Sequence, residues 1–274
     1  MRVQKNVRAV KLRSILQAAM SIGLVLVLAQ VLLQWLAPDH RYWLTPWTVL
    51  SRLPYAWQNG LLGHVGGTLY RSLLGFLIAS TIGVGLGVLI GRSRFLLKWA
   101  MPIVDLCRPL PSAAILPIAM LILGLGERMY LFVIVFGGVW PILLDTIIGV
   151  RYVDSTMQDA VAQMRFGPVT RLWTFVLPEA AAEITSGLRI SLSVCLILTV
   201  TAELFVGSGN GLGRFMSLAQ DGGDYALMYF LVIVIALVGW VLNRLLDSII
   251  SWMPWMRYQY QSEVEPDRGE GRNA

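Results

Sequence analysis

The chain has 274 residues, of which 56% are hydrophobic and only 14% charged, and its mean hydropathy is +0.66. Soluble domains carry roughly 25% charged residues and less than half apolar ones. The composition therefore excludes a water-soluble fold and predicts a protein that lives in a membrane.

Six apolar runs are long enough to be membrane spans, since crossing the hydrocarbon core takes a helix of about 20 residues. The first run is longer than the apolar core of a cleaved signal peptide, so we expect it to be a retained span. Four prolines interrupt the third run, which predicts a broken helix. In chain order the runs are 15–37, 72–91, 99–125, 129–150, 187–206 and 225–250.

The distribution of Lys and Arg predicts the orientation of these spans. Segment 1–14, the two loops on its side and the tail hold fourteen of them, whereas the opposite loops, including 207–224, hold four. Because cytoplasmic loops accumulate basic residues, both termini are predicted to be cytoplasmic, with a disordered tail at 257–274. The net charge of +6 has the same cause, and no nucleic-acid partner is expected.

Two connecting segments carry patterns of their own. Residues 38–70 place tryptophans and tyrosines beside leucines with little charge, which suits the extracytoplasmic membrane–water interface. We expect a short interfacial helix there, with a plain connecting loop as the alternative. The pattern of residues 151–183 predicts two helical stretches. Gly167 separates them, and Leu177–Pro178 ends the second. Such a helical pair on the cytoplasmic face is a docking shape for another subunit.

The second run carries a small residue at every fourth position. Residues four apart share one face of a helix, and in lipid such a smooth face lets helix backbones approach closely. We interpret the stripe as a helix-packing face, with a pore lining as the alternative. It consists of Gly75, Ala79, Gly83, Gly87 and Gly91.

Several ionisable groups lie at or near membrane depth, where an unpartnered charge costs at least about 2.5 kcal/mol. We expect these groups to form structural ion pairs, with the lining of a polar path as the alternative. A spacing of three along a helix would allow Asp105 to pair with Arg108 and Arg244 to pair with Asp247. Arg189 and Glu203 lie nearer the ends of their span. No catalytic triad, paired carboxylates or cluster of metal ligands occurs, so neither a catalytic residue nor a metal site is predicted.

The cytoplasmic segment resembles the "EAA" loop in the permease subunits of bacterial binding-protein-dependent ABC importers, which reads Glu-Ala-Ala, three residues, Gly, nine residues, Ile-x-Leu-Pro. Anchored on Leu177–Pro178, this spacing puts Asp159-Ala160-Val161 on Glu-Ala-Ala and Arg165 on the glycine. Further segments are similar to the nitrate, sulfonate and taurine branch of that family: His64-x-x-x-Thr68-Leu69-x-Arg71, Arg108-Pro109-Leu110-Pro111, Trp140-Pro141-Ile142-Leu143-x-Asp145, Ala202-Glu203 and Gly209-x-Gly211-Leu212-Gly213.

The resemblance implies an all-α membrane protein of the bacterial inner membrane, with six transmembrane helices at 15–256 in the type I ABC importer permease fold. It implies a homodimer that works with two cytoplasmic ABC ATPase subunits and an extracytoplasmic solute-binding protein. ATP and Mg would be used by the ATPase, so this chain would bind no cofactor and would not be an enzyme. The solute would be a sulfonate- or nitrate-like oxyanion or another small organic anion.

The resemblance also implies residue roles. Coupling to the ATPase would use Asp159, Ala160, Val161, Arg165, Gly167, Leu177 and Pro178, and a translocation path would involve Arg108, Pro109, Pro111, Asp145 and Glu203. Because Arg165 adds bulk and charge where the family has glycine, we expect a dedicated ATPase. A secondary transporter or a channel working without an ATPase is the alternative. It predicts internal repeats, and none is evident.

Overall fold

The computed structural model describes residues 45–151, 167, 170, 172–207 and 209–252. The chain divides into two units between residues 51 and 52, and each is described by itself. The described part of the first unit contains the short helix α2 (Pro46–Leu50), which Thr45 caps by accepting a hydrogen bond from the Thr48 amide at 3.3 Å. The elements described below belong to the second unit, which begins with α3 (Leu53–Gln58).

Four helices of the second unit are long and apolar enough to cross a membrane. These are α4 (Leu61–Arg92), α7 (Glu127–Arg151), α11 (Ala181–Val206) and α13 (Tyr225–Ser251). A fifth span would combine α5 (Arg94–Cys107) with η2 (Ser112–Ile115) and α6 (Leu116–Leu123), which are bent by 82°. The described residues contain no strand, which confirms an all-α membrane fold. The runs 1–14, 15–37 and 257–274 lie outside the described residues, so the count of six spans and the side of the termini stay predictions.

Several boundaries differ from those predicted, including the starts of α5 at Arg94 and of α11 at Ala181. Two of the differences affect the site. Helix α4 begins at Leu61 rather than at residue 72, so the predicted interfacial segment 38–70 includes the first turns of this span. Polar side chains at these positions lowered the local hydropathy, but they are bonded to other helices, as described below. The predicted loop 207–224 contains a further helix, α12 (Leu212–Asp221), whose apolar side chains Leu212 and Phe215 are buried.

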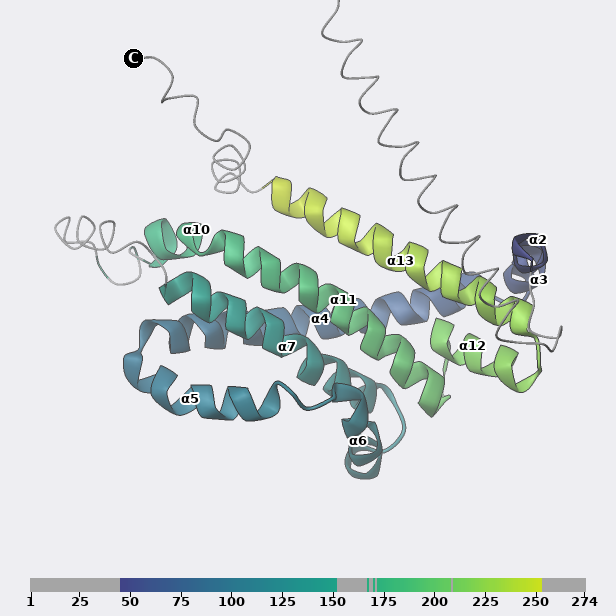
Figure 1. Ribbon diagram of the computed structural model, residues 1–274, viewed down its shortest axis with the longest axis horizontal. Coiled ribbons are helices and arrows are strands. Elements are labelled where there is room, and N and C mark those ends of the chain that lie inside the picture. The colour runs from purple at the N-terminus through teal and green to yellow at the C-terminus, as the bar shows by residue number, and fades with distance from the viewer. Residues whose placement is uncertain (1–44, 152–166, 168–169, 171, 208, 253–274) are drawn as a thin grey trace, which may run out of the picture. The chain divides into compact units, whose positions relative to one another are not determined.

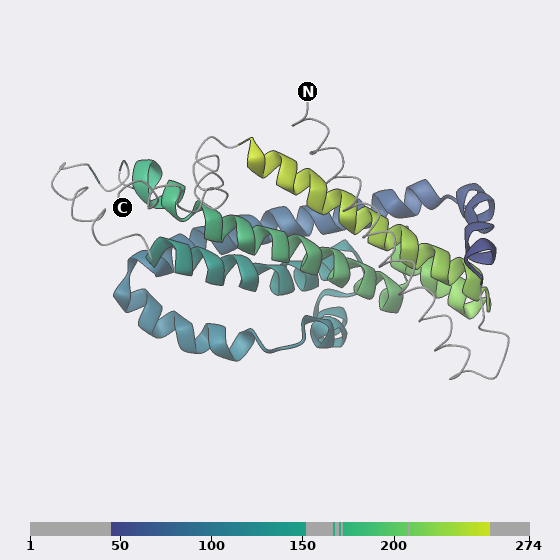
Figure 2. The same cartoon turned by 45° about the horizontal axis from the view of Figure 1, so that its top comes forward.

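Helices α4, α7 and α11 run side by side and enclose the main core (Figure 1). Ile134 and Ile142 of α7 and Cys195 of α11 have no exposed surface in this core. Both views place α5 and α6 on one side of these three helices and α13 on the other (Figure 2). Within a membrane such packing is stabilised by close van der Waals contact rather than by exclusion of water.

The third predicted span is broken, as expected, at Pro109 and Pro111, whereas Pro102 lies inside α5. Helix α5 ends at Cys107, and the chain passes through Pro109 and Pro111 before η2 begins. Proline supplies no backbone N–H and clashes with the preceding turn, and two prolines within three residues favour a break of the helix here. Helix α6 then ends at Gly124, whose φ of 73° lies in the left-handed region that glycine adopts without strain.

From Leu172 onward the cytoplasmic segment is helical and leads directly into α11. A π-helical turn, η3 (Leu172–Val176), is followed by α10 (Leu177–Glu179). The prediction that Leu177–Pro178 ends the helix is wrong. Pro178 lies in the first turn of α10, where its missing N–H is not needed, and the Ala180 amide bonds the Val176 carbonyl at 2.9 Å across it.

Candidate functional site

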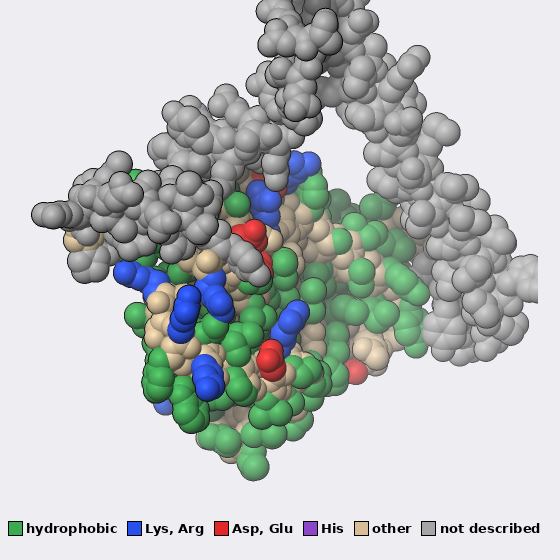
Figure 3. All heavy atoms as spheres, turned by 60° about the vertical axis from the view of Figure 1, so that its left-hand side comes forward, with side chains coloured by type: hydrophobic (Ala, Val, Ile, Leu, Met, Phe, Trp, Pro, Cys, Tyr) green, Lys and Arg blue, Asp and Glu red, His purple; other side chains and the backbone are tan. Residues whose placement is uncertain are grey.

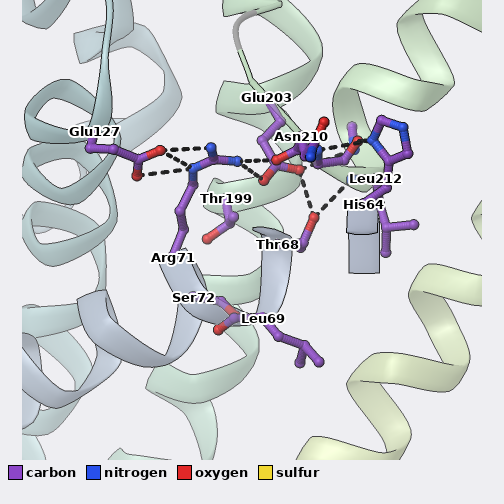
Figure 4. Close-up of polar contacts among 12 residues, drawn as sticks. His64, Thr68, Leu69, Arg71, Ser72, Glu127, Thr199, Glu203, Asn210 and Leu212 are labelled. Atoms are coloured by element: carbon purple, nitrogen blue, oxygen red, sulfur yellow. Dashed lines mark hydrogen bonds and ion pairs between the residues drawn. The ribbon is translucent and has the colours of Figure 1, made fainter. Parts of the chain in front are cut away.

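The most polar part of the described interior is a cluster around Arg71, on the third turn of α4. Only 6% of Arg71 is exposed, yet its guanidinium contacts two carboxylates (Figure 4). Its Nη1 donates to Glu203 Oε1 at 2.8 Å, and its Nη2 donates to Glu127 Oε1 at 2.7 Å. The Tyr130 ring lies 4.6 Å from the guanidinium carbon, in cation–π contact. One cation is thus shared between two anions from different helices.

The two carboxylates have different surroundings. Glu203, near the end of α11, has no exposed surface, whereas 51% of the Glu127 side chain is exposed at the start of α7. Glu203 also accepts hydrogen bonds from Thr68 Oγ1 at 2.8 Å and from the Gly213 amide at 3.1 Å. Burying a charge requires such partners, because an uncompensated buried carboxylate is strongly unfavourable. The Arg71–Glu203 half is therefore the interior half of the cluster.

The same cluster fastens the segment that follows α11. Arg71 Nη1 donates to the Asn210 carbonyl at 2.6 Å, and the Leu212 amide donates to Thr68 Oγ1 at 2.8 Å. His64 extends this set of contacts, since its Nδ1 lies 3.1 Å from the Gly211 amide and its ring stacks on Phe215 of α12 at 4.6 Å. The side chains of α4 therefore hold the backbone of residues 210–212.

Glycine is required where this segment crosses the cluster. A Cβ added at Gly211 would collide with the Glu203 carboxylate, and one added at Gly213 would lie 2.8 Å from Glu203 Cβ. Gly67 of α4 is likewise in close contact with the backbone of Asn210. The Gly209-x-Gly211-Leu212-Gly213 motif thus lets the backbone pass over a buried ion pair.

This arrangement joins helices without offering a reactive centre. Arg71 binds a carboxylate on each of two sides, so its charge is compensated within the cluster. The described residues contain no group of three or more His, Cys, Asp or Glu side chains able to hold a metal ion. The cluster can fix the ends of α4, α7, α11 and α12 relative to one another, which is a mechanical role.

The small-residue stripe of α4 lies against α7 of the same chain. Ile142 and Thr146 of α7 pack directly on it, since a Cβ added at Gly83 would lie 2.9 Å from Ile142 Cβ and one added at Gly87 would lie 2.7 Å from Thr146 Cγ2. Gly75 faces Ile134 in the same way. The other members, Ala79 and Gly91, are buried and half-buried respectively.

The residues implied for a translocation path are not brought together with Glu203. Arg108, Pro109 and Pro111 are exposed at the corner between α5 and η2. Asp145 is half-buried on α7, where a Cβ added at the neighbouring Gly187 would lie 3.0 Å from its Cβ. Glu203 is enclosed in the Arg71 cluster. Its position favours the structural alternative that the sequence left open for it.

One predicted ion pair is replaced by another. The spacing predicted Arg244 with Asp247 inside α13, but the Asp247 carboxylate lies 2.9 Å from Arg189 Nε of α11. Arg244 lies over the Trp240 ring, 5.8 Å from its centroid. An ion pair between helices is formed here because α11 and α13 bring these side chains together, which spacing along one helix does not reveal.

Of the residues implied for coupling to the ATPase, Asp159, Ala160, Val161 and Arg165 lie outside the described residues. Gly167 is described and exposed. Leu177 and Pro178, in α10, are half-buried at the end of α11 opposite to Glu203. The coupling assignment stays a prediction.

Sequence reasoning missed Arg71 and Glu127 as site residues. Arg71 was noted only as part of a family motif, because the second span was predicted to begin at the next residue. Glu127 was placed in a loop. The useful signal was an arginine within a stretch otherwise free of charge from residue 53 to residue 91. A single charge in such a stretch requires a partner, although spacing alone does not identify it.

Comparison with known proteins decides the family. The sequence profile of the family described as "Binding-protein-dependent transport system inner membrane component" matches residues 79–254. The chain belongs to this family. The permease is 30% identical to the nitrate import permease protein NrtB of Synechocystis sp., over 72% of this chain and 70% of that protein. It is also 30% identical to the bicarbonate transport system permease protein CmpB of Synechococcus elongatus, over the same shares of the two chains.

A solved structure agrees in fold. The MetNI methionine ABC transporter in an inward-facing conformation aligns with a TM-score of 0.63 at 19% identity, covering 73% of this chain and 97% of that chain. The permease thus has the type I ABC importer fold and is a multi-pass inner-membrane subunit of an ATP-driven importer. The relatives give no support to a secondary transporter or channel.

Proposed function

We propose that the permease forms a homodimeric path for a small oxyanion, such as nitrate, bicarbonate or a sulfonate. The observation that carries the solute class is the pair of relatives at 30% identity, whose names state nitrate and bicarbonate as their cargo. Both are small, oxygen-rich anions. An extracytoplasmic binding protein would select the solute, and two cytoplasmic ATPases would bind and hydrolyse ATP with Mg, so this chain would not be an enzyme.

Helix α11 offers a direct mechanical link for this function. Its 26 residues run from Ala181, beside the described end of the cytoplasmic segment, to Val206, three residues beyond Glu203, and a helix of that length spans about 39 Å. Displacement of the coupling residues 159–178 by an ATPase would reach the Arg71 cluster through one continuous helix. Rigid-body motion of helices in this manner is a common basis for alternating access.

Uptake of the candidate anions tests the coupling residues. Asp159→Arg should abolish ATP-dependent uptake in proteoliposomes, because it reverses the charge at the proposed ATPase contact, while insertion and yield stay as in the wild type. Asp221→Arg, an equivalent reversal at the exposed end of α12, serves as the matched control and should retain uptake. Normal uptake by Asp159→Arg would remove the coupling role.

The class of solute and the partners need a separate measurement. Gentle purification of the tagged permease should recover an ATPase at one copy per permease, together with a second permease copy detectable by crosslinking. Vesicles that contain the complex and its binding protein should then take up labelled nitrate, bicarbonate or an alkanesulfonate only with internal ATP. Uptake by the permease alone without ATP would contradict the importer, and uptake of none of the three anions would contradict the solute class.

A further inference from the structure

Three basic side chains lie close together at the corner where α4 turns into α5, and no acidic side chain of the described residues pairs with them. Arg92 ends α4, while Arg94 and Lys98 lie one turn apart on α5, and all three side chains are exposed. Figure 3 shows basic side chains gathered on this end of the molecule. No acidic residue occurs in the sequence from 72 to 104. None of the three cations forms an ion pair with another described residue.

The same corner exposes aromatic side chains beside the cations. Phe95 is 70% exposed and Trp99 is 67% exposed, and their ring centroids lie 6.3 Å apart. The opposite face of α5 is anchored, because Val104 is buried against Leu143 and Ile147 of α7. Helix α5 therefore holds a basic and aromatic outer face in a fixed place.

Combined basic and aromatic surfaces of this kind match the membrane–water interface. Tryptophan settles at headgroup depth and phenylalanine at the boundary with the acyl chains, while Lys and Arg side chains bind the phosphates of anionic lipids. Arginine suits phosphate in particular, because its planar donors can bind two phosphate oxygens at once.

We propose that the α4–α5 corner is a binding site for an anionic phospholipid, with Arg92, Arg94 and Lys98 on the headgroup phosphate and Phe95 and Trp99 beside the acyl-chain boundary. Charge complementarity determines this choice of occupant, since the corner is cationic and bacterial membranes supply anionic headgroups. The bound lipid would fasten the N-terminal end of the bent α5–α6 span at the membrane surface. The site is independent of the transported solute.

Native mass spectrometry of the purified full-length permease tests the site, with phosphatidylglycerol and phosphatidylcholine added in equal amounts. The wild type should retain phosphatidylglycerol preferentially. The triple variant R92Q/R94Q/K98Q should bind it about a hundredfold more weakly, because each basic side chain near an anionic surface contributes about fivefold. The charge-conserving variant R92K/R94K/K98R should retain most of the binding.

The control is R128Q, which removes an exposed arginine from the start of α7, at the other end of that helix from Arg151. It should bind phosphatidylglycerol as the wild type does. In nanodiscs, a rising fraction of phosphatidylglycerol should raise the melting temperature of the wild type and of R128Q but not of the triple variant. Equal phosphatidylglycerol retention by the triple variant and the wild type would overturn the proposal. So would a triple variant that keeps its lipid but loses the ATPase on purification, since the corner would then be a protein-docking surface.

Discussion

Removal of Arg71 is the sharpest test of the buried cluster. Arg71→Gln leaves the Glu203 carboxylate with no exposed surface and without its cation, although the bonds from Thr68 and Gly213 remain. Removal of one partner from a buried ion pair costs about 3–5 kcal/mol. The upper part of that range is expected here, because the bond from Arg71 to the Asn210 carbonyl at 2.6 Å is lost as well.

The assay is thermal unfolding of the permease in nanodiscs, followed by intrinsic tryptophan fluorescence at one fixed scan rate. At about 2–4 °C per kcal/mol, the melting temperature of Arg71→Gln should fall by roughly 10 °C or more. Glu127→Gln should lower it far less, by the equivalent of about 1 kcal/mol or below, because half of that side chain is exposed. Arg128→Gln, a neighbouring exposed change, should have no effect.

A double variant separates loss of charge compensation from simple misfolding. In R71L/E203L both charges are replaced by apolar groups, which often stabilise a buried site as well as the ion pair did. This variant should melt above Arg71→Gln. If Arg71→Gln melts within about 2 °C of the wild type, or if Glu127→Gln is equally damaging, the division of the cluster into a buried half and an exposed half is wrong.

Two further predictions concern glycines. Gly83→Leu should destabilise the permease by more than about 1–3 kcal/mol, since even a Cβ there would lie 2.9 Å from Ile142. The control Gly85→Leu should be tolerated, because its Cβ would meet nothing within 4 Å. Thermal unfolding of the two variants measures the difference, and equal melting temperatures would contradict the packing of α4 on α7. Gly211→Ala should abolish uptake and expose residues 209–213 to limited proteolysis, because its Cβ would displace the Glu203 carboxylate. A wild-type proteolysis pattern would show that this segment does not depend on the cluster.

The sequence alone was sufficient wherever a property is local. Hydropathy located two spans to within a few residues, since the predicted runs 129–150 and 225–250 correspond to Glu127–Arg151 and Tyr225–Ser251. The break in the third span followed from proline geometry, which acts on neighbouring residues only. The motifs also indicated the family, because they preserve the order of residue types along the chain.

The tertiary structure decided everything that depends on which segments meet. Arg71 bonds residues that lie 56 and 132 positions away, and no spacing rule reaches that far. The same contacts explain why α4 begins before the apolar run, since its polar first turns are bonded to other helices rather than to water. Asp247 pairs with Arg189 on another helix for the same reason. The sequence shows that a charge within a membrane span needs a partner. Only the packing of the helices determines which side chain lies close enough to be that partner.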